Sequence, residues 1–255
     1  MAKKVFISVG HGGNQPGAVA NGFKEKDLNL SIALACYAEL QRHGVTVLIS
    51  RTKDVDDGDE PATCNAFGAD YAVDIHNNAG GGDGAEVYYS VNGGAGKVLA
   101  QNILDEIVLI GQNSRGIKTR KGSSGKDYYY FIRNTNCPAV IVECAFVDNA
   151  KDIKIIDTEA ERKKMGVAIA KGILKTLEIA YTEEKKPQAP TKTEGVTVNN
   201  LYRIKNEIIV DEPAKVQYTG TGVFTIVEEK TVNGVVYGKL KSGLGWVRLT
   251  NAEIV

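Results

Sequence analysis

The sequence predicts an α/β protein with a mainly parallel sheet, followed by a small all-β part. Residues 1–181 alternate short apolar, β-branched runs with longer segments of helical periodicity, and residues 196–255 show only short runs separated by turns. Alternation at this spacing favours parallel strands that are covered by helices on both faces. Residues 182–195 hold two prolines, several charges and no large apolar residue, so we interpret them as an exposed linker between two domains.

The first part offers five strand candidates and three helix candidates. In chain order, the strand candidates are KKVFISVG (3–10), VTVLIS (45–50), ADYAVDIH (69–76), GAEVYYSV (84–91) and CPAVIVECAFV (137–147). Leu28, Ile32 and Cys36 lie at helical spacing in residues 25–44, where Gly44 marks the end. The other two helices are indicated by Leu99, Ile103, Ile107 and Ile110, and by Met165, Ile169, Ile173 and Leu177.

The last 60 residues show no helical periodicity. The strand candidates here are NEIIVD (206–211), AKVQYT (214–219), GVFTIVEE (222–229), VVYGKLK (235–241) and GWVRLT (245–250). Val232-Asn233-Gly234-Val235 is typical of a type I′ hairpin. We expect a small all-β barrel.

Composition excludes several classes of partner. Lys+Arg and Asp+Glu are equal at 31 each, so no overall field draws the chain to nucleic acid or to an anionic membrane. The sequence has no run of 18 apolar residues, and only VFISV stands between Met-Ala-Lys-Lys and the first glycine. We therefore expect synthesis in the cytoplasm without a signal peptide, and four reduced cysteines at Cys36, Cys64, Cys137 and Cys144. The sequence does not indicate an oligomeric state.

Polar side chains stand where the predicted strands and the first helix meet one edge of the sheet. His11 follows the first strand, His76 closes YAVDI, Glu143 closes PAVIV, and Glu25 begins the first predicted helix. Carboxyl ends of parallel strands share an edge, so we expect these groups to converge. Two histidines and one glutamate form a recognised catalytic zinc set, and a further glutamate is the usual proton carrier.

Each of these residues also has a purely structural interpretation. A histidine at a strand end is often only hydrogen-bonded, KEKD is typical of a solvated first helical turn, and Glu143 could belong to a buried ion pair. Two histidines at equivalent strand ends favour the metal site, and an acid within PAVIVECAFV favours a functional cleft. His43, in QRHG, is better explained as a cation at a helix C-terminus.

Two other chemistries fit the sequence poorly. The turn GHGGNQPG resembles a phosphate-binding loop, but Gln15 stands where GxGxxG needs glycine, and no GxxxxGK[ST] is present. Cys144 follows Glu143 on a predicted strand, so a nucleophilic thiol there would point to the opposite face.

The motifs together resemble a known enzyme family. SVGHGG with His11, KEKDLNL with Glu25, SRTKD, DIHNNA with His76 and PAVIVECAFVDN with Glu143 are similar, in this order, to the zinc-dependent N-acetylmuramoyl-L-alanine amidases of the amidase-3 type. The resemblance covers residues 1–181. It implies that His11, Glu25 and His76 bind one zinc ion, that Glu143 is the catalytic glutamate, and that Asn78 contacts substrate.

The same resemblance implies a six-stranded mixed sheet with flanking helices. It also implies bacterial peptidoglycan as substrate, cut between the lactyl group of N-acetylmuramic acid and L-alanine. The segment GKLKSGLGWVRL (238–249) is similar to bacterial SH3-like modules, which often bind cell walls. Trp246 is either a core residue of that module, which we favour, or a ligand platform.

An amidase joined to a wall-binding module resembles a phage endolysin, which reaches the wall through a separate membrane pore. Two alternatives stay open. One is a bacterial autolysin of the same activity, released when a mother cell lyses. The other is a non-catalytic wall-binding protein on an amidase fold, which the complete set of His11, Glu25, His76 and Glu143 disfavours.

Overall fold

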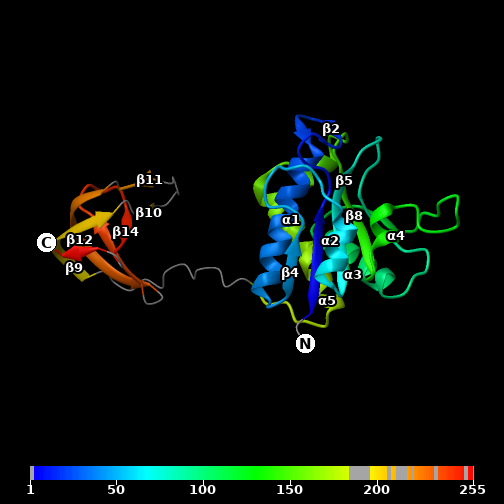
Figure 1. The fold of residues 1–255 in the computed structure, drawn as a ribbon. Helices are drawn as coiled ribbons and strands as arrows, with labels where there is room; N and C mark the ends of the chain where they lie inside the picture. The colour runs from blue at the N-terminus through cyan, green and yellow to red at the C-terminus, as the bar shows by residue number, and fades with distance from the viewer. Residues whose placement is uncertain are drawn as a thin grey trace. The chain divides into compact units, whose positions relative to one another are not determined.

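The computed structural model describes residues 3–183, 196–205, 208–210, 217–219, 221–232, 235–249 and 252–254. The chain divides into two compact units, Met1–Thr182 and Glu183–Val255 (Figure 1). Each unit is built around its own hydrophobic core. Residues 184–195, most of the linker expected at 182–195, lie outside the described residues.

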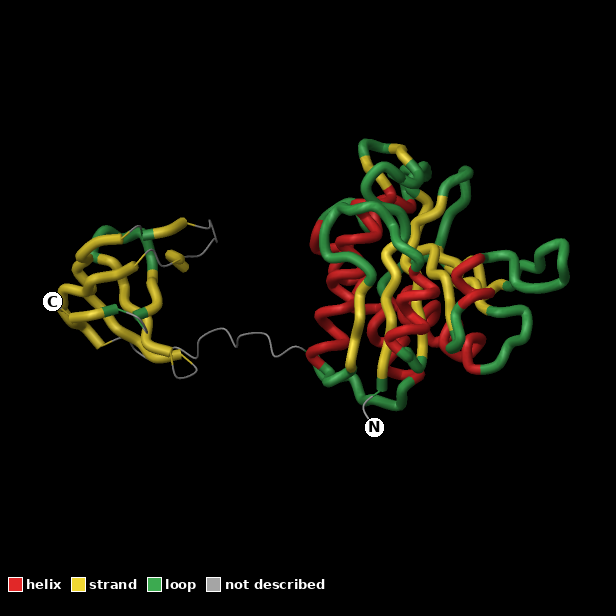
Figure 2. Tube along the Cα trace, viewed as in Figure 1, coloured by secondary structure: helices red, strands yellow, loops and turns green. Residues whose placement is uncertain are grey.

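The first unit alternates strands and helices, as the sequence predicts (Figure 2). Its elements are β1 (Lys4–Val9), β2 (Val19–Ala20), β3 (Phe23–Lys24), α1 (Glu25–Arg42), β4 (Thr46–Ile49), α2 (Glu60–Phe67), β5 (Tyr71–Asn78), β6 (Ala85–Tyr89), α3 (Ala95–Leu109), β7 (Ser114–Lys118), α4 (Tyr130–Asn134), β8 (Ala139–Phe146), the 3₁₀ helix η1 (Asp152–Ile155) and α5 (Glu159–Thr176).

Six of the strands form one sheet in the order β4-β1-β5-β8-β6-β7. All neighbouring pairs are parallel except β6 and β8, which are antiparallel. The predictions of a mainly parallel sheet and of six mixed strands are therefore confirmed. The edge strand β7 was not among the strand candidates, because SRGIK lacks a run of apolar residues.

The two faces of this sheet are covered differently. One face, with Ile7, Ile75 and Val142, packs against α1, α3 and α5 in the main core. The other face, with Phe6 and Ile141, packs against α2 and α4 in a smaller core. Because successive strand residues point to opposite faces, Asp74, His76, Ile141 and Glu143 all belong to the face with the smaller core. That core stops short of the carboxyl edge of the sheet, where the polar residues begin.

In the described part of the second unit, seven strands form one antiparallel sheet in the order β11-β10-β14-β13-β12-β9-β15. The strands are β9 (Val196–Lys205), β10 (Ile208–Val210), β11 (Gln217–Tyr218), β12 (Thr221–Val232), β13 (Val235–Leu240), β14 (Trp246–Arg248) and β15 (Glu253–Ile254). The all-β prediction is confirmed. Strand β9 is an addition, because the polar residues in VTVNNLYRIK hide its periodicity.

The predicted hairpin at residues 232–235 and the position of Trp246 both belong to this unit. Val232 pairs with Val235, as the predicted hairpin requires, while Asn233 and Gly234 lie outside the described residues. Trp246 is only half-buried and lies under the Lys230 ammonium, 3.9 Å from Nζ to the ring centroid. Among the described residues, the core of this unit consists of Tyr202, Ile204, Ile226, Leu240, Val247 and Leu249. The interpretation of Trp246 as a core residue is therefore wrong.

Among the described residues, no helix combines the length and the apolar character needed to cross a membrane.

Candidate active site

The site begins as a row of polar residues across three neighbouring strands. His76 on β5 is the register partner of Glu143 on β8, and Glu143 is in turn the partner of Glu86 on β6. Strand β5 continues past His76 to Asn78, and β8 continues past Glu143 to Phe146. Strand residues therefore precede and follow both His76 and Glu143, and the hydrogen bonds of the sheet fix the backbone positions of the two residues.

Glu25 enters the row from the first residue of α1, as expected. Its Oε2 accepts a hydrogen bond from the Ala18 amide at 2.9 Å, and its Oε1 accepts one from the Asn77 amide at 3.2 Å. The buried Asn29, one helical turn later, donates to Glu25 Oε1 at 3.3 Å and to the Gly10 carbonyl at 2.8 Å. The carboxylate is thus clamped to the turn after β1 and to the end of β5.

His11, Glu25 and His76 come together at one point. Glu25 Oε2 lies 3.3 Å from His11 Nε2, and Glu25 Oε1 lies 3.0 Å from His76 Nδ1. One ligand atom from each of the three residues lies within 4.8 Å of the others. Two imidazole nitrogens and a carboxylate oxygen, converging from separate elements, fit the donor set of a catalytic zinc ion with a position left for water. The structure therefore brings the three predicted ligands together.

Two glycines make room for this cluster. A Cβ at Gly10 would lie 2.2 Å from the His76 ring, and a Cβ at Gly17 would lie 2.5 Å from Glu25 Oε2. Gly17 also has φ of +67°, a conformation that side-chain-bearing residues rarely adopt. His11 itself has φ of +60°, which is unusual for a residue other than glycine and is typical of functional sites.

Glu25 and His76 each shift the pKa of the other. Burial acts to raise the pKa of Glu25, but hydrogen bonds with His11 and His76 outweigh it and hold the pKa well below its usual range. Burial likewise opposes the charged form of His76, yet the Asp74 and Glu25 carboxylates raise its pKa above the usual value. A site that holds its carboxylate ionised and attracts positive charge is suited to a cation.

Asp74 is a residue that the sequence analysis missed. It stands two residues before His76 on the same face of β5, is 7% exposed, and its Oδ2 lies 3.3 Å from His76 Nε2. The two ring nitrogens of His76 therefore face different carboxylates, Nδ1 toward Glu25 and Nε2 toward Asp74. The alternation in YAVDIH could have placed Asp74 beside His76, because both share one strand face.

Glu143 is close to the cluster but has a different environment. Its Oε2 is buried and has no hydrogen-bond partner among the described residues. Burial raises the pKa of Glu143 to about 7, with the charge of His76 opposing the rise. Because no cation of Lys or Arg contacts this oxygen in the described structure, a structural ion pair does not explain it. A carboxyl group with a pKa near neutrality can accept a proton and give it back at physiological pH.

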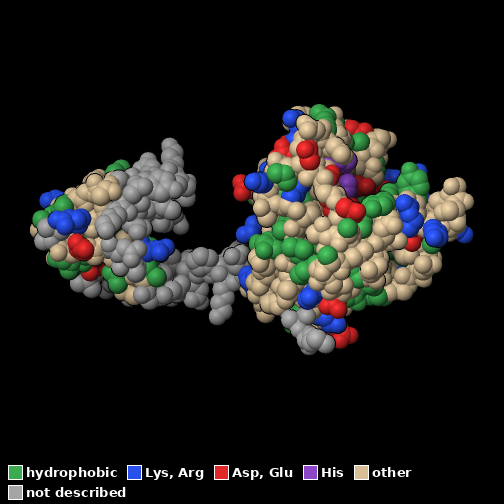
Figure 3. Space-filling view, viewed as in Figure 1, with side chains coloured by type: hydrophobic (Ala, Val, Ile, Leu, Met, Phe, Trp, Pro, Cys, Tyr) green, Lys and Arg blue, Asp and Glu red, His purple; other side chains and the backbone are tan. Residues whose placement is uncertain are grey.

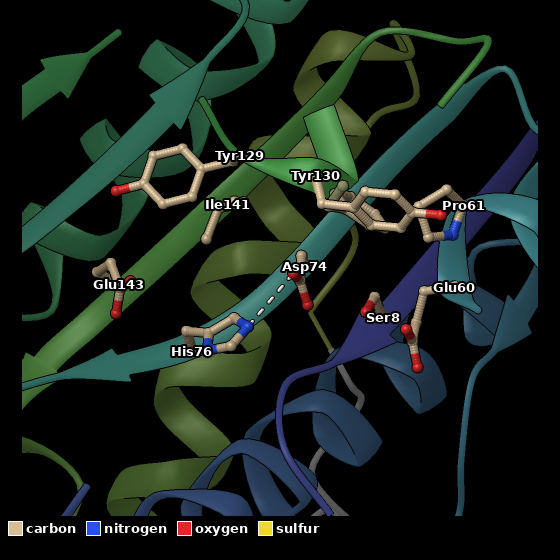
Figure 4. A pocket seen from close by; sticks show the side chains of 10 residues that line it. Ser8, Glu60, Pro61, Asp74, His76, Tyr129, Tyr130, Ile141 and Glu143 are labelled. Atoms are coloured by element: carbon tan, nitrogen blue, oxygen red, sulfur yellow. Dashed lines mark ion pairs between the residues drawn. The ribbon is translucent and has the colours of Figure 1, made fainter. Parts of the chain in front are cut away.

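A pocket of ≈ 270 Å³ opens beside His76 and Glu143. Figure 4 shows His76 and Glu143 at one end and Asp74, Ser8 and Glu60 at the other, with Tyr129 and Tyr130 above them. Pro61, Phe131 and Ile141 complete the lining. In Figure 3, histidine side chains reach the surface of the first unit with acidic side chains next to them. The site is therefore accessible from solvent.

Glu86 lies on β6, on the other side of Glu143 from His76, and it is joined to Asn78 at the end of β5. Asn78 Nδ2 donates to Glu86 Oε1 at 3.1 Å, and Asn78 Oδ1 accepts from the Ala79 amide at 2.8 Å. Glu86 is buried and is paired with Arg115, at 2.7 Å, and with Lys118. Glu86 and its two cations were missed because they come from β6 and β7, and the pairing of β6 with β8 and of β7 with β6 is set by the tertiary fold.

The loop after β4 closes over the turn that carries His11. Asp54 accepts a hydrogen bond from the Gly13 amide and Asp56 accepts one from the Asn14 amide, both at 2.8 Å. Arg51, in the SRTKD motif, is buried and donates to the Lys26 carbonyl at 2.9 Å. The amides of the glycine turn are thus already bonded to carboxylates, which argues further against a phosphate-binding loop.

The remaining candidates have structural roles. Cys144 is fully buried in the main core on the opposite face from Glu143, and burial raises the pKa of its thiol well above the usual value. His43 caps the end of α1, where its Nε2 accepts a hydrogen bond from the Thr182 amide at 3.0 Å and its ring stacks on Tyr181. Neither residue belongs to the site.

The fold and this cluster define a class: a doubly covered α/β domain with a candidate metal centre and a free carboxyl group at the carboxyl edge of its sheet. Comparison with known proteins identifies the family. The family model Amidase_3, described as N-acetylmuramoyl-L-alanine amidase, matches residues 5–175. The chain belongs to this family. It is therefore an enzyme that hydrolyses peptidoglycan, and the alternative of a non-catalytic wall-binding protein is removed.

Individual relatives cover different shares of the chain. N-acetylmuramoyl-L-alanine amidase CwlM of Bacillus licheniformis is 36% identical over 183 residues, which are 69% of this chain and 70% of the relative. The endolysin of Bacillus phage SPP1 is 33% identical over 261 residues, covering 96% of this chain and 95% of the relative. Among solved structures, Cwp6 from Clostridium difficile superposes with a TM-score of 0.68 at 40% identity, over 69% of this chain and 30% of that chain.

Proposed function

We propose that His11, Glu25 and His76 hold one zinc ion and that Glu143 moves the proton during hydrolysis of the amide between N-acetylmuramic acid and L-alanine. The observation that carries this proposal is the buried, unpartnered Oε2 of Glu143 next to three converging metal ligands. Membership of the amidase family supports the choice of bond.

Zinc, when bound, supplies a Lewis acid that polarises the scissile carbonyl and lowers the pKa of water. Glu143 accepts a proton from the attacking water as the new bond to the carbonyl carbon forms. It then gives this proton to the alanine nitrogen as the carbon–nitrogen bond breaks. A carboxyl group with a pKa of about 7 suits both transfers. The products are a lactyl carboxylate on the glycan and a free amino terminus on the peptide.

The surrounding residues position this machinery. Asp74 accepts the Nε2 proton of His76, which leaves Nδ1 with its lone pair toward the metal. The amides of Ala18 and Asn77 hold the Glu25 carboxylate in one orientation. Asn78 is oriented by Glu86, and we propose that its remaining hydrogen-bonding capacity serves the substrate.

The experiment that tests the proposed bond is mass analysis of purified cell wall after digestion. We expect soluble peptides with a new amino-terminal L-alanine, and glycan strands of unchanged length that carry lactyl carboxylates. New reducing ends on the glycan, or new carboxyl ends within the peptide, would contradict the proposal.

We further propose that the protein acts as a phage endolysin. The similarity to the SPP1 endolysin supports this, because it extends over 96% of this chain and so includes the all-β unit. The bacterial amidase CwlM matches only 69% of this chain, so it gives less support to the autolysin alternative. In this proposal the protein is made in the host cytoplasm, reaches the wall after the membrane is opened, and uses residues 196–255 to bind the wall.

Controlled expression tests the release step. Cells with a susceptible wall that make the protein internally should keep their turbidity until a membrane-permeabilising agent is added, and should then lyse. The Glu143→Gln variant, made at the same level, should not lyse them after permeabilisation. Lysis by the unmodified protein without any permeabilising agent would contradict release through a separate pore.

A further inference from the structure

Two cysteines approach each other away from the metal cluster. Cys64 lies in α2 and Cys137 lies in the connection between α4 and β8, and their Sγ atoms are 3.9 Å apart. Both are free thiols. A disulfide needs the two sulfurs to come to about 2 Å, so a movement of roughly 2 Å is required, which is within reach of side-chain rotation.

Asn65 joins helix α2, which carries Cys64, to the segment that precedes Cys137. Its Nδ2 donates to the Asn134 carbonyl at 2.8 Å, and its Oδ1 accepts from the Asn136 amide at 2.7 Å. Asn65 directly follows Cys64, and Asn136 directly precedes Cys137. The fold therefore holds the two segments that carry the cysteines side by side in the reduced protein, before any covalent bond exists.

The two sulfurs differ in access. Cys137 is half-buried and lines a surface cavity of ≈ 270 Å³ with Pro138 and Thr135, whereas Cys64 is 1% exposed behind it. A hydrogen bond from the Cys64 thiol lowers the pKa of Cys137. An oxidant would thus meet Cys137 first, and Cys64 would stand behind it as the second thiol.

We propose that Cys137 and Cys64 form a thiol–disulfide exchange site, in which Cys137 reacts with a small-molecule disulfide such as oxidised glutathione and Cys64 completes an internal disulfide. The Cys137 thiolate attacks one sulfur of the oxidant, forms a mixed disulfide and expels one glutathione thiolate. The Cys64 thiolate, after losing its proton to solvent, then attacks Cys137 Sγ and expels the second glutathione thiolate. Two protein thiols are oxidised and one molecule of glutathione disulfide is reduced to two thiols.

A disulfide between Cys64 and Cys137 would join α2 to the segment that follows α4, and both helices contribute to the lining of the pocket beside His76 and Glu143. Helix α2 carries Glu60 and Pro61, while Tyr129 directly precedes α4 and Tyr130 is its first residue. Cys64 belongs to the smaller core together with Phe131 and Ile141, and Cys137 packs against it. A cross-link between residues 64 and 137 constrains the unfolded chain, so the oxidised protein should be more stable. The inference is independent of the proposed catalytic roles, since neither sulfur belongs to the metal cluster or contacts Glu143.

The test is to incubate the folded full-length protein in buffers of rising ratio of oxidised to reduced glutathione. Free thiols are then blocked with an alkylating agent, and the protein is digested without reduction for peptide mass analysis. We expect a peptide pair linked through Cys64 and Cys137, while Cys36 and Cys144, both fully buried, stay as alkylatable thiols after unfolding. The oxidised protein should melt at a temperature higher by several degrees.

Serine variants separate the two steps. Cys64→Ser should stop at a stable glutathione adduct on Cys137, and Cys137→Ser should show neither adduct nor cross-link. Both variants should lose the rise in melting temperature. A glutathione adduct on Cys137 in the unmodified protein that never proceeds to the cross-link would overturn the proposal, as would the absence of any reaction at high oxidant ratio.

Discussion

At the scale of single residues, Asp74 provides a test of how the metal ligands are oriented. We expect Asp74→Asn to bind zinc roughly 10- to 100-fold more weakly, because the ionised acceptor for the His76 Nε2 proton is lost. Zinc titration of the metal-free variant measures this. Glu60→Gln is the matched control, since Glu60 lines the same pocket and accepts instead from the Gly58 amide. Equal zinc affinity in Asp74→Asn and the unmodified protein would exclude an orienting role.

Glu143 leads to a prediction about stability and pH in the metal-free protein. Its pKa of about 7 in the folded state is above its ordinary value near 4.5, so folding favours the protonated form. The stability of the protein should therefore fall as pH rises from about 5 to 8, by an amount on the order of 1–3 kcal/mol from this group.

Glu143→Gln carries no charge and should lose this dependence. The variant should melt at a higher temperature than the unmodified protein at pH 8, and at a similar temperature at pH 5. Thermal unfolding in the presence of a chelator, at both pH values, measures the difference. A variant that is less stable than the unmodified protein at pH 8 would indicate that Glu143 has a structural partner.

At the scale of elements, the turn after β1 must approach β5 closely. Gly10→Ala places a methyl group 2.2 Å from the His76 ring, so the ring must move and zinc should bind at least about tenfold more weakly. The backbone of Gly10 is not in the left-handed region, so the effect should be confined to the ring. Gly58→Ala, whose Cβ meets nothing within 4 Å, is the control. Unchanged zinc affinity in Gly10→Ala would show that His76 is not a ligand in this orientation.

Element patterns explain how much of the fold and site the sequence predicts. The runs YAVDI and PAVIV identify buried strands that lie side by side, and the polar residues that follow them, His76 and Glu143, are register partners. Strands β7 and β9 were missed because polar residues interrupt their apolar pattern. Glu86 was missed because its importance comes from neighbours on other strands, and a single sequence does not state which strands are adjacent. Asp74 was within reach of the sequence, because the alternation in YAVDIH puts it on the same strand face as His76.

At the scale of the whole molecule, the two units should divide the work. Each has its own core, so we expect a fragment of residues 1–182 to fold, bind one zinc ion and cut small soluble muropeptides as fast as the full chain. On intact walls the fragment should be slower, because it loses the local concentration that a tethered wall-binding unit provides. Turnover on both substrates measures this.

The second unit has its own test. Residues 183–255 alone should sediment with cell walls and cut nothing. Equal clearing of intact walls by the fragment and the full chain would show that the second unit does not target the wall. In that case, association of two copies through the exposed edges of its sheet would be the role to examine.

The central claim is that a metal held by His11, Glu25 and His76 works with a separate proton carrier, Glu143. The most direct measurement is turnover of a soluble muropeptide by Glu143→Gln and by the unmodified protein, each with its zinc content determined on the same sample. The account predicts one zinc ion per chain in both proteins and a rate about 10²- to 10⁴-fold lower in the variant. A fully zinc-loaded Glu143→Gln protein that retains the unmodified rate would contradict it.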